Sequence, residues 1–111
     1  MRSLQDIKKD SRIQIQTVGM DGGQGWLTLH GKTFRVVWSN GGGWEHVSMS
    51  TSSRCPTWEE MCKAKDVFFY PYEICVEYHP AEKDYVNFHP YCLHIWRPVD
   101  GKFPKPPKIF V

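Results

Sequence analysis

Residues 55–69, CPTWEEMCKAKDVFF, decide the fold class because they carry the clearest helix signal in the chain. Thr57 can accept a hydrogen bond from the backbone N–H of Glu60 while the Glu60 carboxylate reaches back, which is a capping box. Glu59 and Glu60 also place negative charge where the helix dipole favours it. The apolar side chains that recur near one face are Trp58, Met61, Cys62, Phe68 and Phe69. We therefore predict a helix over about residues 57–69 whose apolar face packs on a sheet.

The segments on both sides of this helix alternate apolar and polar residues, which is typical of half-buried strands. In chain order they are residues 12–16, 26–30, 34–39, 44–50, 73–79 and 91–97. Residues 21–23, Asp-Gly-Gly, and residues 30–32, His-Gly-Lys, are expected to turn the chain. The glycine triplet at 41–43 is also a candidate phosphate loop, but such a loop leads into a helix and this one enters a strand, which favours a hairpin turn.

These elements together predict an α+β domain, with a mostly antiparallel sheet and the main helix packed across one face. A short N-terminal helix ends near Asp10, since Ser3 and Asp6 have the spacing of a helix cap. A length of 111 residues is enough for one core and too little for two. We therefore treat residues 1–111 as a single domain.

Residues 99–111, VDGKFPKPPKIFV, are expected to form an extended tail. Three prolines exclude a regular helix and favour a polyproline-like run: Pro104, Pro106 and Pro107. The tail ends in three apolar residues: Ile109, Phe110 and Val111. This apolar end either tucks against the domain, which we favour, or is an arm offered to a partner.

Parity along the last strands separates two faces, because successive side chains of a strand point in opposite directions. One parity is apolar and should lie under the helix: Val47, Met49, Ile74, Val76, Tyr78, Leu93 and Ile95. The opposite parity gathers Trp44, His46, Ser48, Cys75, Glu77, His79, Cys92, His94 and Trp96. If the three strands are neighbours, these side chains form one surface of imidazole, indole, carboxylate and thiol groups.

Four interpretations of this surface stay open. Imidazole, indole and arginine groups can recognise a planar ligand or a protein partner. Imidazole and thiolate groups can instead bind zinc as a cofactor, with the ligands His46, His79, Cys92 and His94. A histidine acid or base, or Glu77 as the base beside a metal, would be catalytic. The fourth interpretation is structural, since histidines before proline often only end strands. No zinc-knuckle spacing, nucleophile elbow or phosphate loop is present, so the sequence favours binding over catalysis.

The charge distribution argues against a dedicated nucleic-acid binder, because the net charge is only +2. Residues 1–35 carry six Lys/Arg against three Asp/Glu, residues 45–84 carry four against eight, and residues 97–111 carry four against one. The ends are thus basic and the middle is acidic. Weak phosphate contacts are compatible with this pattern, so a nucleotide or nucleic-acid partner stays open.

Three features of the sequence bear on its cellular compartment. The opening MRSLQDIKKD has no apolar segment of the kind that export requires, and no stretch approaches the length of a membrane span. The four cysteines have no CxxC spacing. These features predict a cytosolic protein with reduced thiols and no membrane partner.

Three ordered motifs are similar to a small uncharacterised domain family of phages and prophages. They are GGGWEHVSMS at 41–50, RCPTWEEMCKAKDVFF at 54–69 and HPYCLHIWRP at 89–98. The resemblance covers about residues 34–111 and leaves residues 1–33 outside. It carries no established activity and no catalytic residues.

The resemblance implies a setting in which very small accessory proteins often act by occupying a host protein. We therefore expect a non-catalytic binding protein in the host cytosol, one that inhibits an immune nuclease as anti-CRISPR proteins do, or that sequesters its nucleotide signal. The residues expected to bind are Trp44, His46, Glu77, His79, His94, Trp96 and Arg97. The alternatives are a metal-dependent hydrolase or nuclease and a virion or assembly component.

Overall fold

The computed structural model describes residues 1–51, 53–79 and 91–103 of the chain. Its elements in chain order are α1 (Leu4–Lys9), β1 (Ile13–Val18), β2 (Gly22–Leu29), β3 (Lys32–Gly41), β4 (Trp44–Thr51), α2 (Trp58–Phe68), β5 (Cys75–His79) and β6 (Tyr91–Pro98). Within the described residues, neither helix has the length and apolar character needed to cross a bilayer.

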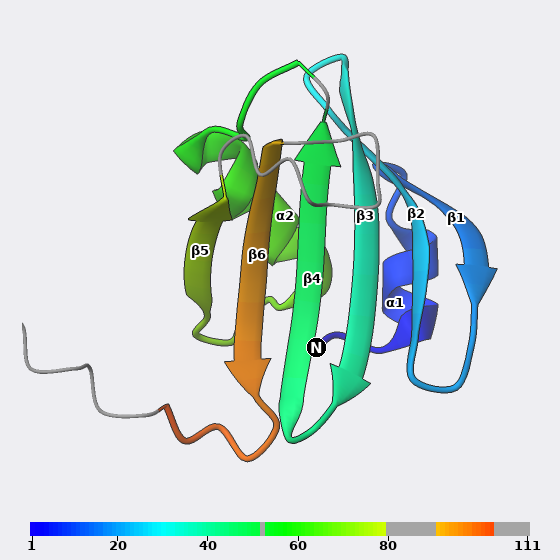
Figure 1. The fold of residues 1–111 in the computed structure, drawn as a ribbon. Helices are drawn as coiled ribbons and strands as arrows, with labels where there is room; N and C mark the ends of the chain where they lie inside the picture. Colours follow the sequence, from blue (N-terminus) through cyan, green and yellow to red (C-terminus); the bar gives the residue numbers. More distant parts are fainter. Residues whose placement is uncertain (52, 80–90, 104–111) are drawn as a thin grey trace, which may run out of the picture.

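The strands form one six-stranded sheet in the order β1-β2-β3-β4-β6-β5, and every neighbouring pair is antiparallel. The first four strands follow the chain order, whereas β6 inserts between β4 and β5. Both helices lie on the same face of this sheet (Figure 1). The predicted α+β class is therefore confirmed, with a mostly antiparallel sheet, one longer helix and one short N-terminal helix.

The start of α2 forms as the sequence predicts. The Thr57 side chain accepts from the backbone N–H of Glu60 at 3.2 Å, and the Glu60 carboxylate accepts from the Thr57 N–H at 2.8 Å. Arg54 donates to both carboxylate oxygens of Glu60 at 2.6 and 3.0 Å. The capping box thus holds a carboxylate that is almost fully buried and charge-paired.

The hydrophobic core fills the layer between the sheet and the two helices. Its largest fully buried side chains are Ile7, Leu27, Phe34, Met49, Phe68, Phe69, Leu93 and Ile95. Trp38 closes one side of this layer with its ring centroid 5.7 Å from that of Phe68. Ile7 comes from α1, whose N-cap Ser3 accepts from the Asp6 N–H at 3.2 Å, so the N-terminal helix also forms as predicted.

Two residues of α2 do not pack on the sheet as predicted. Trp58 is 67% exposed and Cys62 is exposed, while the side chains that face the sheet are Met61, Ala64, Val67 and Phe68. Small Ala64 lets the helix approach the sheet closely, and the contact stripe is centred on it. Trp58 and Cys62 lie beside this stripe, so they face the space next to β5 instead.

Residues 21–23 do not turn the chain as predicted, because Gly22 and Gly23 lie in β2 and the reversal falls at residues 19–21. Gly23 pairs with Trp38, and a Cβ on Gly23 would lie 2.4 Å from a carbon of that indole. The glycine is required for this close approach rather than for a turn.

The other two predicted turns are confirmed. His30 and Gly31 have φ values of 49° and 75° between β2 and β3. Gly42 and Gly43 have φ values of 61° and 83° between β3 and β4, as a two-residue hairpin requires. The triplet at 41–43 is therefore a hairpin turn.

Candidate functional site

The candidate site lies on the face of the sheet opposite to α1 and α2, which we call the open face. The condition that the last three strands are neighbours is met, since β6 lies between β4 and β5. Residues that are opposite one another in an antiparallel pair share a face. The register therefore places on the open face Trp44, His46, Ser48 and Ser50 of β4, Cys92, His94 and Trp96 of β6, and Cys75 and Glu77 of β5.

Two histidines from different strands meet at the centre of this group. The rings of His46 and His94 stack with centroids 4.9 Å apart and an interplanar angle of 23°. The Nε2 of His46 lies 2.7 Å from the Nδ1 of His94, and the Nε2 of His94 lies 3.4 Å from the Sγ of Cys92. A hydrogen bond between two ring nitrogens needs one donor and one acceptor, so the geometry disfavours the state in which both rings are protonated.

Burial keeps His46 neutral. Desolvation lowers the pKa of His46 below its usual value, and the negative charge of Glu77 opposes this effect only in part. Glu77 lies on β5 opposite His94 and is exposed. At neutral pH His46 therefore acts as a neutral imidazole that hydrogen-bonds to His94 rather than as a cation.

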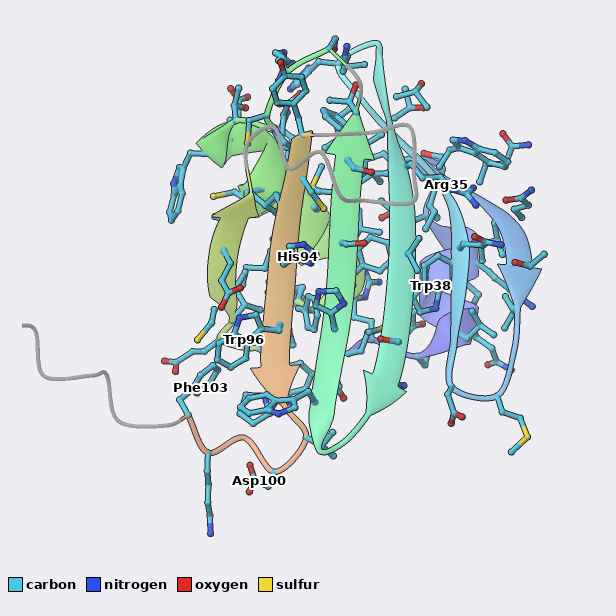
Figure 2. The ribbon with its side chains drawn as sticks, in the orientation of Figure 1. Arg35, Trp38, His94, Trp96, Asp100 and Phe103 are labelled. Atoms are coloured by element: carbon cyan, nitrogen blue, oxygen red, sulfur yellow. The ribbon has the colours of Figure 1, made fainter. Side chains whose placement is uncertain are left out.

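Two tryptophans lie next to the histidines, at the end of the sheet where β4 begins and β6 ends. Trp44 and Trp96 meet edge to face with ring centroids 4.7 Å apart, and Trp44 is 39% exposed. Phe103 continues this aromatic group, with its centroid 6.5 Å from that of Trp96 (Figure 2). Such pairs provide large, rigid contact area near a polar centre.

A second polar-aromatic group on the open face was missed from the sequence. The guanidinium of Arg35 on β3 lies 4.9 Å above the ring of Trp26 on β2. It donates to the side-chain oxygens of Gln16 and Gln24 at 2.7 and 2.5 Å. Among the described residues no carboxylate pairs with this cation. Trp26 and Arg35 have the open-face parity within their strands, which is the sequence signal that would have identified them.

One predicted binding residue, Arg97, does not join this surface, and a second, His79, has a side chain outside the described residues. Arg97 lies on the helix-covered face, where its guanidinium is 4.1 Å from the Tyr72 ring and 3.8 Å from the Glu45 carboxylate. His79 pairs with Cys92 through the backbone of β5, but its side chain lies outside the described residues. Trp44, His46, His94 and Trp96 are brought together.

The described side chains do not form a metal site. No group of three or more His, Cys, Asp or Glu residues among them could hold a metal ion. His46 and His94 direct ring nitrogens at one another, which leaves fewer lone pairs for a metal. The predicted zinc ligands include His79, whose side chain is outside the described part, so the zinc alternative stays a prediction.

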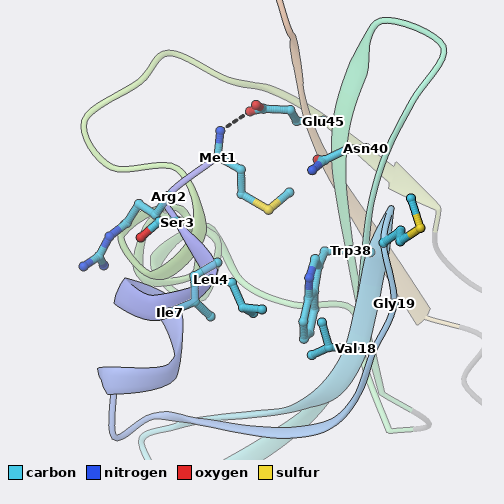
Figure 3. Close-up of a pocket in the computed structure, with 12 residues that line it drawn as sticks. Met1, Arg2, Ser3, Leu4, Ile7, Val18, Gly19, Trp38, Asn40 and Glu45 are labelled. Atoms are coloured by element: carbon cyan, nitrogen blue, oxygen red, sulfur yellow. Dashed lines mark hydrogen bonds and ion pairs between the residues drawn. The ribbon is translucent and has the colours of Figure 1, made fainter.

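A cavity of about 240 Å³ lies on the other side of the sheet, between α1 and the strands (Figure 3). Trp38, Leu4 and Ile7 form its apolar wall. Its acidic group, Glu45, already contacts the Met1 amine and lies near Arg97. Because this carboxylate is engaged, the cavity is a weaker candidate than the open face.

A family model described as a domain of unknown function (DUF7694) matches residues 36–100, which is more than half of the 111-residue chain. Comparison with curated proteins and with solved structures gave no match. The matched region includes the histidine pair and both flanking tryptophans, and it leaves out Trp26 and Arg35.

Proposed function

This chain belongs to the DUF7694 family, and on that premise we propose that it is a non-catalytic binding protein that holds a partner protein on the open face of its sheet. One observation carries the proposal: both helices cover the same face of the sheet, and on the opposite face, over which no helix of the described residues lies, the histidine pair stands beside the Trp44–Trp96 pair. Tryptophan and arginine are the side chains that most often dominate the binding energy of protein interfaces.

The contacts of the aromatic rings favour a protein partner over single-stranded nucleic acid. Base stacking needs free ring faces. On this surface the rings of His46 and His94 stack on one another, and the guanidinium of Arg35 lies over the ring of Trp26. Among the described side chains, this surface presents ring edges and the Arg35 cation, and these suit side-chain and backbone groups of a protein.

The narrower form of the proposal is a phage or prophage protein that inhibits a host defence nuclease. The motif resemblance supports this setting. Among the exposed carboxylates of the acidic middle of the chain, Glu77 lies on the open face, where its charge would repel nucleic acid and attract a basic channel. Sequestration of a nucleotide signal is the other form, and it would use the Arg35 cation.

The test is affinity capture from a host lysate with the full chain and three variants. Trp44→Ala and His94→Ala change the open face, whereas Lys8→Ala changes an exposed position on α1. We expect a defined protein to be retained by the wild-type and Lys8→Ala chains. Once that protein is purified, titration calorimetry should show a loss of about thirtyfold in affinity for Trp44→Ala, as for an interface anchor.

Retention of the same protein by all three variants at equal affinity would remove the open face from the proposal. Three further measurements separate the alternatives. Fluorescence anisotropy with a labelled single-stranded oligonucleotide tests nucleic-acid binding, and elemental analysis after dialysis tests for stoichiometric zinc. Light scattering tests for the stable self-association that an assembly component requires.

A further inference from the structure

A second surface lies beside β5, away from the open face. The exposed side of α2 and the apolar side of β5 form a groove of about 380 Å³. Trp58 and Cys62 line it from α2, Val76 lines it from β5, and Ile74, directly before β5, and Phe103 complete the lining. Trp58 is 67% exposed there, so a large apolar surface of the described residues remains open to water.

The strand that borders this groove is at the edge of the sheet. Among the described strands β5 pairs only with β6, so its outer edge carries backbone N–H and C=O groups without a strand partner. An apolar groove next to a free strand edge is the arrangement into which an extended segment adds as a further strand. Backbone groups would provide hydrogen bonds, and the groove would accept alternate side chains.

The chain itself delivers such a segment to this place. Phe103 contacts the groove, and residues 104–111 follow it directly. Eight extended residues span about 26 Å, whereas the eleven residues of α2 span about 16 Å. The segment is therefore long enough to follow the whole groove from the point at which it starts.

The composition of this segment also fits the groove. Pro104, Pro106 and Pro107 have no N–H and cannot add to a ladder. Ile109, Phe110 and Val111 have donors and are the residue types that strands prefer. Proline-rich segments are in general stiff spacers, so the composition favours the apolar end as the part suited to docking.

We propose that residues 108–111 of the chain add to the outer edge of β5 in its own molecule, with Ile109 to Val111 placing apolar side chains in the groove beside Trp58. A tethered segment has a high local concentration at a site that its own chain already touches, which favours the same molecule over a second copy. The docked segment would cover Trp58 and Cys62, and its backbone would form hydrogen bonds with the N–H and C=O groups at the outer edge of β5.

The test measures how fast iodoacetamide alkylates each cysteine of the full chain, resolved by peptide mass spectrometry. None of the four cysteines forms a disulfide: Cys55, Cys62, Cys75 and Cys92. Phe110→Asp should release the segment and raise the alkylation rate of Cys62 about tenfold. The reason is that a segment docked for most of the time protects the thiol, and its release removes this protection. Met20→Asp is the matched control, because Met20 is 100% exposed at the β1–β2 hairpin and should leave the rate unchanged.

Three results bear on the proposal. An equal Cys62 rate in the wild type and in Phe110→Asp would overturn it. Protection of Cys62 that disappears on dilution would also overturn it, because the occupant would then be a second copy. The rate at Cys92, which is 3% exposed, reports whether a variant has unfolded.

If Phe110→Asp unfolds, the full chain with Val111→Cys gives an independent answer. Mild oxidation should form a disulfide between Cys62 and the new cysteine within one molecule, seen as a monomer on a non-reducing gel and mapped by mass spectrometry. Absence of this bond, or its formation only between two molecules, would overturn the proposal.

Discussion

The two faces of the sheet are made by the same strands and have opposite character. On the helix-covered face Phe34, Val36 and Val47 are 0% exposed. Their immediate neighbours on the open face, Arg35 and His46, are half-buried and make polar contacts. Alternate residues of one strand thus serve the hydrophobic core and the proposed binding surface, so stability and binding should separate under mutation.

The largest expected effect comes from the covered face. Phe34→Ala removes a ring that is fully buried between sheet and helices, and it should lower the free energy of unfolding by about 3–5 kcal/mol. Thr33→Ala, one residue earlier and exposed, should change it by less than about 0.5 kcal/mol. Urea denaturation followed by circular dichroism measures both values, and similar losses in the two variants would contradict the division of the faces.

A smaller effect is expected where glycine permits close packing on the covered face. A Cβ on Gly23 would lie 2.4 Å from the Trp38 ring, so Gly23→Ala should destabilise the chain by about 1–3 kcal/mol. Gly41→Ala is the matched control, since a Cβ there meets nothing within 4 Å. Thermal unfolding of the two variants distinguishes them, and a neutral Gly23→Ala would mean that Trp38 does not pack against β2.

A pH effect on stability is expected from the ion pair between Arg54 and Glu60 at the start of α2. The hydrogen-bonded Arg54 lowers the pKa of Glu60, so the stability from this carboxylate is present above its unfolded pKa and is lost as the pH falls through the folded value. Glu60→Gln should therefore be less stable than the wild type at neutral pH, and the difference should shrink in acid. Urea midpoints across the acidic range measure it, and a constant difference would contradict this assignment.

The smallest effect concerns His46. Burial lowers its pKa in the folded state. Between about pH 6.5 and the folded pKa, the unfolded chain therefore binds more protons than the folded chain, and the free energy of unfolding decreases as the pH decreases. His46→Gln should flatten this part of the stability curve. Urea midpoints between neutral and mildly acidic pH check it, with Lys8→Ala as control, and a slope unchanged by His46→Gln would show that the ring titrates normally.

Local signals in the sequence predicted much of this fold. The capping box at Thr57 and the strand alternation depend on neighbouring residues, so they could be identified directly. The insertion of β6 between β4 and β5 could not, because strand order depends on long-range pairing. The 2.7 Å contact between His46 and His94 requires that order and one particular register, so the sequence predicted their common face but not their hydrogen bond.

The errors have physical causes as well. Trp58 was predicted to pack on the sheet, but helix periodicity defines a wide apolar arc, and only contact with the sheet decides which part of it is buried. Arg97 was selected for its charge although its parity is that of Ile95, and it lies on the covered face beside Tyr72. Trp26 and Arg35 lie in consecutive strands joined by the predicted turn at residues 30–32, so parity applied to these two strands would have identified them as well.

The central claim is that the open face is surface in the free protein rather than a second core. Hydroxyl-radical footprinting of the full chain, resolved by residue, tests it most directly. We expect Trp44 to be oxidised readily, Trp26 to be oxidised at an intermediate rate, and Phe34 and Leu93 to be protected. Protection of Trp44 and Trp26 to the level of Phe34 would contradict the account, because it would mean that both faces of the sheet are sealed.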